Sequence, residues 1–82
     1  MGRTFEVGGD YFTEQIIAAV FVGFRTTSNP STVTVHPELM KKIRAKFVNK
    51  VVGPKLVGDV EVFCGLRVVE DATKEPGHIS VS

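Results

Sequence analysis

The stretch Val33 to Phe47, VTVHPELMKKIRAKF, changes its hydrophobic period at one dipeptide, and the architecture follows from that change. Its β-branched start predicts a short strand from Thr32 to Val35. Pro37 then stands in the first turn of a helix, where its missing N–H costs little, and Glu38 complements the positive end of the helix dipole. The apolar stripe that should face the core consists of Leu39, Met40, Ile43 and Phe47.

After this helix, Gly53-Pro54 is a stop signal and the period falls to two. The alternation predicts a strand with one face made of Val60, Val62 and Cys64 and the other of Asp59, Glu61 and Phe63. Gly65 indicates a bulge or a bend before a further strand in LRVVED. Pro76-Gly77 indicates a turn into a last short strand, HISV.

The apolar segment YFTEQIIAAVFVGF precedes the polar loop RTTSNPS, which spans Arg25 to Ser31. We favour a helix from about Tyr11 to Val22, with Asp10 as its cap and a short strand in FEV before it. The alternative is that AVFVGF forms a central strand covered on both faces. The order of elements predicts a single α+β domain over residues 1–82. It has two helices and a small, mainly antiparallel sheet of three to four strands.

The first helix is apolar on nearly all sides, whereas a small sheet can cover only one face of it. Burying one such side chain is worth about 1.5 to 3 kcal/mol. We therefore expect a homo-oligomer, a dimer or higher, or a constitutive protein partner. The predicted interface consists of Ile16, Ile17, Val20, Phe21 and Phe24.

Composition narrows the class of protein. The 82 residues are 43% hydrophobic and 23% charged, which is typical of one globular domain. A single cysteine, Cys64, forms no internal disulfide and favours a reducing compartment. The sequence has neither an apolar run of about 20 residues nor a signal-peptide pattern. We expect a soluble, intracellular protein that does not bind a membrane.

Charge is distributed unevenly although its net value is only +1. The basic block, which contains no acid, consists of Lys41, Lys42, Arg44, Lys46, Lys50 and Lys55. It is the candidate contact for a partner or for phosphates, since each neutralised phosphate strengthens binding at low salt. The aromatic residue among the cations, Phe47, belongs to the apolar stripe and is not available for base stacking, so a solvated helix face is the favoured interpretation.

Residues that support catalysis or metal binding are scarce. His36, His78 and Cys64 are not spaced as a nucleophile pair, and three such donors are one short of a closed zinc site. The acids around Glu70-Asp71 lack the alternating spacing of a calcium loop, and no glycine-rich phosphate loop is present. We predict no catalytic residue, no metal and no cofactor, so the chain is not expected to be an enzyme.

The order of the pieces resembles the segment of tailed-phage major capsid proteins that forms their spine helix and central sheet. That segment runs as an apolar helix, a polar loop, a strand ending in NP or HP that starts a helix, and a strand pair of the form x-G-x-P-V-V-x-D-x-x-P-x-G-x-I. The corresponding pieces of this chain are FTEQIIAAVFVGF, RTTSNPS, TVTVHPELMKKIRAKF and VFCGLRVVEDATKEPGHISV. Such capsid proteins have several hundred residues, so 82 residues are not expected to form a shell. The resemblance implies a phage-like origin and a scaffold that works by protein contact.

These features lead us to expect a non-enzymatic, phage-type interaction protein, either an accessory virion component or an inhibitor of a host or defence protein. It would be located in the host cytoplasm or in the virion. The basic block and the acidic turn from Glu70 to Glu75 would face the target. The alternatives are a nucleic-acid binder acting through Lys41, Lys42, Arg44 and Lys46, or an oligomer that holds a small anionic ligand between subunits.

Overall fold

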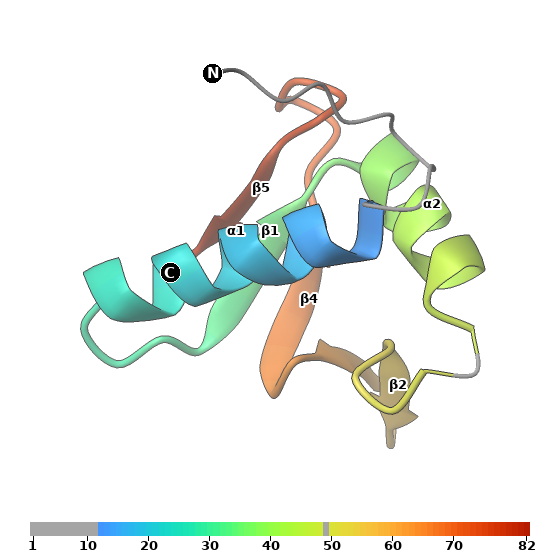
Figure 1. Cartoon of the computed structure of the whole chain (residues 1–82), viewed down its shortest axis with the longest axis horizontal. Coiled ribbons are helices and arrows are strands. Elements are labelled where there is room, and N and C mark those ends of the chain that lie inside the picture. The colour runs from blue at the N-terminus through green and yellow to red at the C-terminus, as the bar shows by residue number, and fades with distance from the viewer. Residues whose placement is uncertain (1–11, 49) are drawn as a thin grey trace.

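The computed structural model describes residues 12–48 and 50–82 and contains two helices and one five-stranded sheet (Figure 1). The elements are α1 (Phe12–Thr26), β1 (Thr32–Val35), α2 (Pro37–Lys46), β2 (Lys55–Val57), β3 (Val60–Phe63), β4 (Leu66–Glu70) and β5 (Ile79–Val81). The α+β class is confirmed, but the sheet has five strands rather than three to four because β2 was not predicted. The predicted FEV strand and the Asp10 cap lie outside the described residues.

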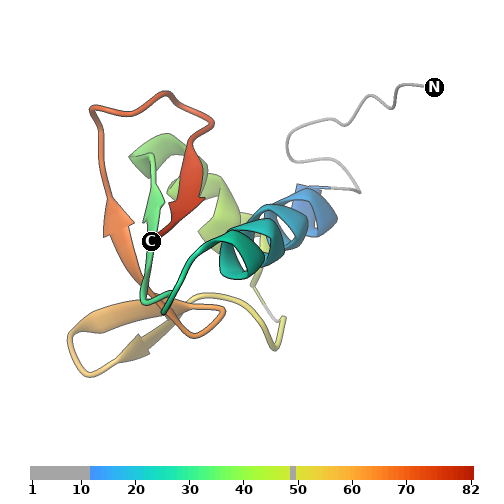
Figure 2. The same cartoon turned by 90° about the vertical axis from the view of Figure 1, so that its left-hand side faces the viewer.

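The strand order in the sheet is β2-β3-β4-β1-β5. Strands β1 and β4 are parallel, and every other neighbouring pair in the sheet is antiparallel. Parallel neighbours need a crossover connection, which α2 and the β2–β3 hairpin provide together. In both views the hairpin lies at the end of the molecule opposite to the loop between β4 and β5 (Figure 1, Figure 2).

The junction between β1 and α2 forms as the sequence predicted. Pro37 is in the first turn, and His36 caps the helix with its Nδ1 atom, which accepts a hydrogen bond from the Glu38 N–H at 3.0 Å. This bond satisfies one of the free amide groups at the helix start and leaves the ring proton of a neutral His36 on Nε2. All four residues of the predicted stripe are buried, namely Leu39, Met40, Ile43 and Phe47.

Helix α1 extends to Thr26, four residues past its predicted end, and the strand alternative for AVFVGF is wrong. Gly23 explains how the helix continues beside the sheet, since a Cβ atom placed there would lie 2.5 Å from Cγ2 of Val81 in β5. The bare backbone therefore lets α1 approach β5 closely. Just after the helix, the Thr27 hydroxyl donates to the Val81 carbonyl at 3.3 Å, which fastens the end of α1 to the same strand.

Two tight turns build the β2–β3–β4 hairpins. Cys64 and Gly65 have φ values of 53° and 78° and form a two-residue turn, with Phe63 paired to Leu66 across it. Two positive φ values in succession match the twist of the flanking strands, so Gly65 marks a hairpin turn rather than a bulge or a bend. The predicted alternation holds from Val60 to Phe63, with Phe63 buried, whereas Cys64 lies in the turn.

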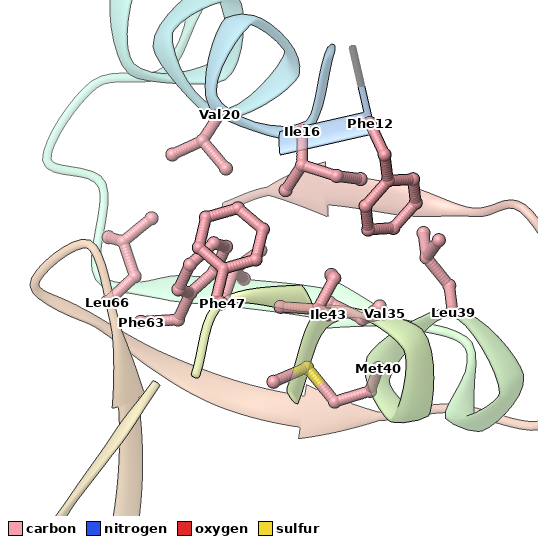
Figure 3. Packing of buried hydrophobic residues seen from close by; sticks show 11 residues of the cluster. Phe12, Ile16, Val20, Val35, Leu39, Met40, Ile43, Phe47, Phe63 and Leu66 are labelled. Atoms are coloured by element: carbon pink, nitrogen blue, oxygen red, sulfur yellow. The ribbon is translucent and has the colours of Figure 1, made fainter. Parts of the chain in front are cut away.

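The core is one cluster between the two helices and one face of the sheet (Figure 3). The rings of Phe47 from α2 and Phe63 from β3 meet edge to face, with centroids 5.2 Å apart. Register places Val33 beside Val68 of β4 and Val81 of β5, so these side chains share the face that the helices cover. The buried residues are Phe12, Ile16, Val20, Val33, Val35, Leu39, Met40, Ile43, Phe47, Phe63 and Leu66.

The opposite face of the sheet, which we call the open face, consists of the alternate residues of the strands. Its central row joins Lys55, Val62, Arg67 and Thr32 across four strands. Val57 pairs directly with Val60 on the same face, and both remain exposed. In the part of the chain that the structure describes, the buried cluster takes its sheet residues from the covered face alone.

Candidate functional site

The predicted oligomer interface is only partly at the surface. Ile16 and Val20 are 6% and 0% exposed and belong to the chain's own core, so their assignment to an interface is wrong. The physical reason is that α1 packs on both β5 and α2, which together cover a wider stripe than one sheet face would. Ile17 and Phe24 are partly buried against the core. Phe21 is 56% exposed and remains available for a partner.

Exposed apolar residues are concentrated in a region that sequence reasoning did not select. The segment after α2 and the hairpin that follows contribute Val48, Val51, Val52, Leu56, Val57 and Val60, and α1 contributes Phe21 and Val22. The available signal was the run VVGPKLVGDV, residues 51 to 60, which carries five valines or leucines without a helical period. An unburied run of this kind is a sign of a contact surface.

An open groove of about 340 Å³ runs between α1 and the segment after α2. We call it the apolar groove. Its lining comes from Ile17, Ala18 and Phe21 on α1 and from Phe47, Lys50 and Val52 on the other side, with Thr13 and Glu14 at one margin. The volume falls within the range of small-ligand and peptide pockets, and most of the wall is apolar.

A second groove of about 350 Å³, the basic groove, shares Phe47 and Lys50 with the first. Its charged lining residues are Arg44, Lys50, Lys55 and Glu61, and Val48 and Gly53-Pro54 complete it. Because Phe47 and Lys50 belong to both grooves, the two hollows adjoin. We call the two grooves together the docking surface. Three of the six cations that sequence analysis selected therefore lie at the docking surface.

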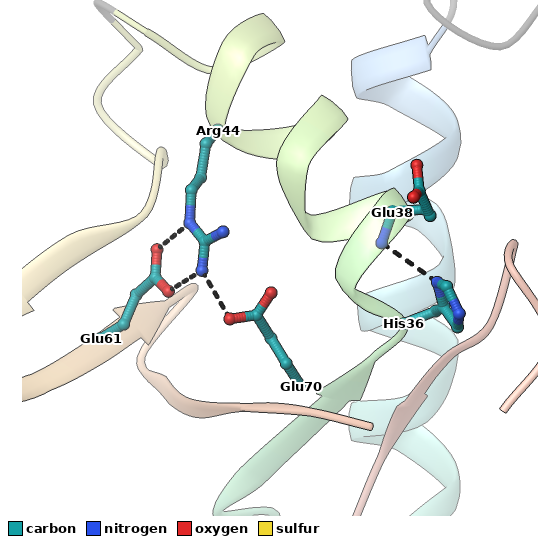
Figure 4. Close-up of polar contacts among 5 residues, drawn as sticks. All are labelled: His36, Glu38, Arg44, Glu61 and Glu70. Carbon is teal, nitrogen blue, oxygen red and sulfur yellow. Dashed lines mark hydrogen bonds and ion pairs between the residues drawn. The ribbon is translucent and has the colours of Figure 1, made fainter. Parts of the chain in front are cut away.

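Arg44 is already occupied by two carboxylates (Figure 4). Its Nε donates to Glu61 at 3.0 Å, and its NH2 group donates to Glu61 at 2.6 Å and to Glu70 at 3.0 Å. The hydrogen bonds to Glu61 and then Glu70 raise the pKa of Arg44, and burial opposes them. The pairing links α2 to β3 and β4. Arg44 is therefore an internal ion-pair partner, and its prediction as a free phosphate contact receives no support from this geometry.

The five lysines of the basic block are all exposed. Within residues 12–48 and 50–82, Arg44 is the one member of the block that forms an ion pair with a carboxylate. Lys50 and Lys55 line the basic groove. Lys41, Lys42 and Lys46 lie on the solvent side of α2, away from the buried stripe, as predicted. The block is thus divided between a groove and an outer helix face.

The acidic turn begins beside the docking surface, because Glu70 pairs with Arg44, which lines the basic groove. Asp71 accepts hydrogen bonds from the hydroxyl and the amide of Thr73, and these bonds lower the pKa of Asp71. Glu70 is held by Arg44. The loop between β4 and β5 lies at the other end of the molecule from the β2–β3 hairpin (Figure 2).

The residues with nucleophilic or metal-binding side chains are not brought together. Cys64 precedes β4, whereas His36 follows β1, and these parallel strands place the two residues at opposite ends of the sheet. Burial raises the pKa of the Cys64 thiol, which keeps it protonated and weakly nucleophilic. His78 hydrogen-bonds the Ser80 hydroxyl at 2.9 Å. Among the described residues, no group of three or more His, Cys, Asp and Glu is placed to hold a metal ion.

None of the helices in the described part of the chain combines the length and the apolarity needed to cross a bilayer. Comparison with models of protein families, with curated proteins and with solved structures finds no match to this chain. The resemblance to phage capsid segments therefore stays a prediction.

Proposed function

We propose that this chain is a non-enzymatic protein-interaction module that binds another polypeptide through the docking surface. The observation that carries the proposal is Phe21, which is more than half exposed beside a groove whose other wall contains Val52. Large apolar side chains around a hollow are typical of interaction sites, and aromatic residues at their centre often supply much of the binding energy.

The free energy of burying the exposed apolar side chains indicates how strong such binding would be. Phe21, Val48 and Val52 are each only about half to two-thirds exposed, so covering them would contribute roughly 2.5 to 5 kcal/mol in total, on a scale of about 1.5 to 3 kcal/mol for a fully exposed side chain. Association itself costs about 4 to 15 kcal/mol in lost translational and rotational freedom. The apolar contacts alone therefore support weak binding. Polar and charged contacts around them must supply the rest of the affinity and the selectivity.

The resemblance to tailed-phage capsid segments supports a more specific form of this function. It favours a phage protein that works by surface contact, either as an accessory component of the virion or as an inhibitor of a host or defence protein. The docking surface suits both roles, since each needs one exposed patch on a small stable body.

Self-association is part of the same proposal and has its own surface. Val57 and Val60 form a directly paired, exposed couple on the open face, apart from the grooves. A second copy that covers this couple would form a two-fold dimer. Sedimentation equilibrium at millimolar concentration should show a mass above that of one chain, and Val57→Lys should return it to one chain. A single-chain mass for the unaltered protein would rule out the dimer.

Partner capture with matched variants tests the main proposal. Val22 follows Phe21 on α1 and is 50% exposed, but it does not line the groove, so Val22→Ser is the control for Phe21→Ser. Both changes are at the surface and should alter stability by no more than about 0.5 kcal/mol. A true partner should be captured from lysate by the unaltered chain and by Val22→Ser, and lost with Phe21→Ser. Equal capture by all three, or equal loss with both variants, would contradict the proposal.

Nucleic-acid binding is the second candidate, and the exposed row of Lys41, Lys42 and Lys46 on the outer face of α2 favours it. Arg44, the fourth residue predicted for this role, is engaged by Glu61 and Glu70. Binding through phosphates is strongest at low salt, so a mobility-shift titration at about 50 mM salt is decisive. A shift that is lost when the three lysines become glutamine would favour this candidate over protein binding.

A further inference from the structure

We propose that the docking surface takes an acidic peptide segment of a partner protein, with an apolar side chain in the apolar groove and carboxylates beside Lys50 and Lys55. This inference rests on the proposed function and names the chemistry of its partner. A ligand for the docking surface needs both properties, because the two grooves adjoin at Phe47 and Lys50.

The balance of charge in the basic groove points to an anion. Both acids near its wall, Glu61 and Glu70, pair with Arg44, so this cluster of one cation and two carboxylates has a net charge of only −1. Lys50 and Lys55 add two positive charges that no carboxylate of the described residues pairs with. Together with the ion-pair cluster, these lysines leave a cationic surplus of one, and carboxylates of a ligand complement it.

The apolar groove has the opposite character. Ile17, Ala18 and Val52 form its walls with the rings of Phe21 and Phe47. Among the described residues that line it, the one acid is Glu14, which belongs to the first turn of α1. A bound segment should therefore have a preferred direction, with its carboxylates near Lys50 and Lys55 and any cation near Glu14. An apolar anchor such as Leu or Phe would fill the space between them.

A peptide suits this surface better than a nucleic acid does. Phosphates would match Lys50 and Lys55, but a regular phosphate backbone offers no aliphatic group to fill the space between Ile17 and Val52. A peptide can alternate apolar and acidic side chains within a few residues. The two chemistries of the docking surface are adjacent, which is the spacing that such a segment satisfies.

The test is a titration of the ¹⁵N-labelled full chain, monitored through its amide NMR signals at about 50 mM salt. The probe is a twelve-residue peptide with one central Leu-Phe pair and glutamates on both sides, and the matched probe has glutamine in place of each glutamate. Binding of the acidic probe should shift the amides around Ile17, Phe21, Lys50 and Val52. Raising the salt to about 500 mM should weaken it several-fold, since exposed charges are then screened.

Matched double variants distinguish an effect of the groove lysines from an effect of the net charge of the protein. Lys50→Gln with Lys55→Gln should weaken binding of the acidic probe about three-fold to ten-fold, as expected for two exposed ion pairs. Lys41→Gln with Lys42→Gln removes the same charge from the outer face of α2 and should leave the affinity within about two-fold. Equal weakening by the two double variants, or shifts confined to the outer face of α2, would overturn the proposal.

The remaining outcomes also decide the question. Equal binding of the glutamine probe would overturn the acidic partner and leave the proposed function standing. Failure of both probes to shift any amide at millimolar concentration would overturn the inference, and the function would then be judged by the capture experiment with Phe21→Ser.

Shifts of the groove amides with protein concentration alone would mean that a second copy fills the groove, and stronger shifts with a single-stranded oligonucleotide would mean a nucleic-acid ligand. Either result overturns the acidic peptide.

Discussion

Helix α1 and the segment from Val48 to Val60 are both rich in apolar residues, yet different forces hold them in the fold. In α1, residues spaced by four, such as Ile16 and Val20, are buried against the sheet and α2. In the second segment, most large side chains remain exposed. That segment is positioned by sheet pairing, by turns with positive φ and by Arg44, which reaches from α2 to β3 and β4.

The difference shows that the period of apolar residues matters more for burial than their number does. A stripe spaced by four stays on one side of a helix and meets one surface along its whole length. A three-residue edge strand such as β2 extends past the helices, so both of its faces remain accessible. The apolar side chains of the second segment are consequently available for recognition, whereas those of the α1 stripe provide stability.

The largest expected effect concerns the buried stripe. Ile16→Ala removes most of a core side chain and should lower the free energy of unfolding by about 2 to 5 kcal/mol. Val51→Ala in the exposed segment should change it by less than about 0.5 kcal/mol. Urea denaturation followed by circular dichroism measures both. Similar losses for the two variants would mean that the second segment is buried in solution, and the contrast between the regions would be lost.

The contact between α1 and β5 is the next effect in size. Gly23→Ala places a methyl group where Val81 already lies, so the helix or the strand must move. Such overpacking should destabilise by about 1 to 3 kcal/mol, although alanine favours helix over glycine by about 1 kcal/mol. Thermal unfolding of the variant shows whether the substitution lowers or raises the stability of the fold. A rise in stability would show that helix propensity dominates and that the close approach is not needed to hold α1.

The turn between β3 and β4, which follows the second region, offers a smaller test of how the hairpins are held. Gly65 has a φ of 78° with open space around it, so the effect of Gly65→Ala comes from the backbone alone. A left-handed alanine should cost about 1 to 2 kcal/mol. Gly77→Ala, also in open space but without a positive φ, is the control and should be nearly neutral. Denaturant titration measures the free energy of unfolding of both variants. If the two values are equal, the left-handed geometry of the turn does not stabilise the hairpin.

The smallest expected effect concerns Arg44. Its pairs with Glu61 and Glu70 are partly exposed, so each should contribute only about 0.2 to 1 kcal/mol. Arg44→Gln should destabilise by up to about 2 kcal/mol at low salt, and the loss should shrink at about 1 M salt. Arg67→Gln on the open face is the control, since the same charge is removed without these pairs. A loss that salt leaves unchanged would indicate that Arg44 acts by packing.

Local signals in the sequence predicted much of the fold. The strand from Thr32 to Val35, the helix start at Pro37 and its buried stripe follow from β-branching, proline chemistry and a four-residue period. These signals act between residues a few positions apart, so they need no knowledge of the rest of the chain. The same reasoning missed β2, because three residues between two glycine-containing turns carry too little periodicity to be recognised as a strand.

The docking surface was only partly foreseen, and the reason is physical. Charge counting selected Lys50 and Lys55, and apolar content selected Ile17 and Phe21. Their arrangement around shared walls depends on contacts between α1 and the chain after α2, which are more than 25 residues apart in sequence. The assignment of Arg44 to two carboxylates depends likewise on the register of β3 and β4. Local order comes from the chemistry of neighbouring residues, whereas which side chains face water together is settled when distant segments pack.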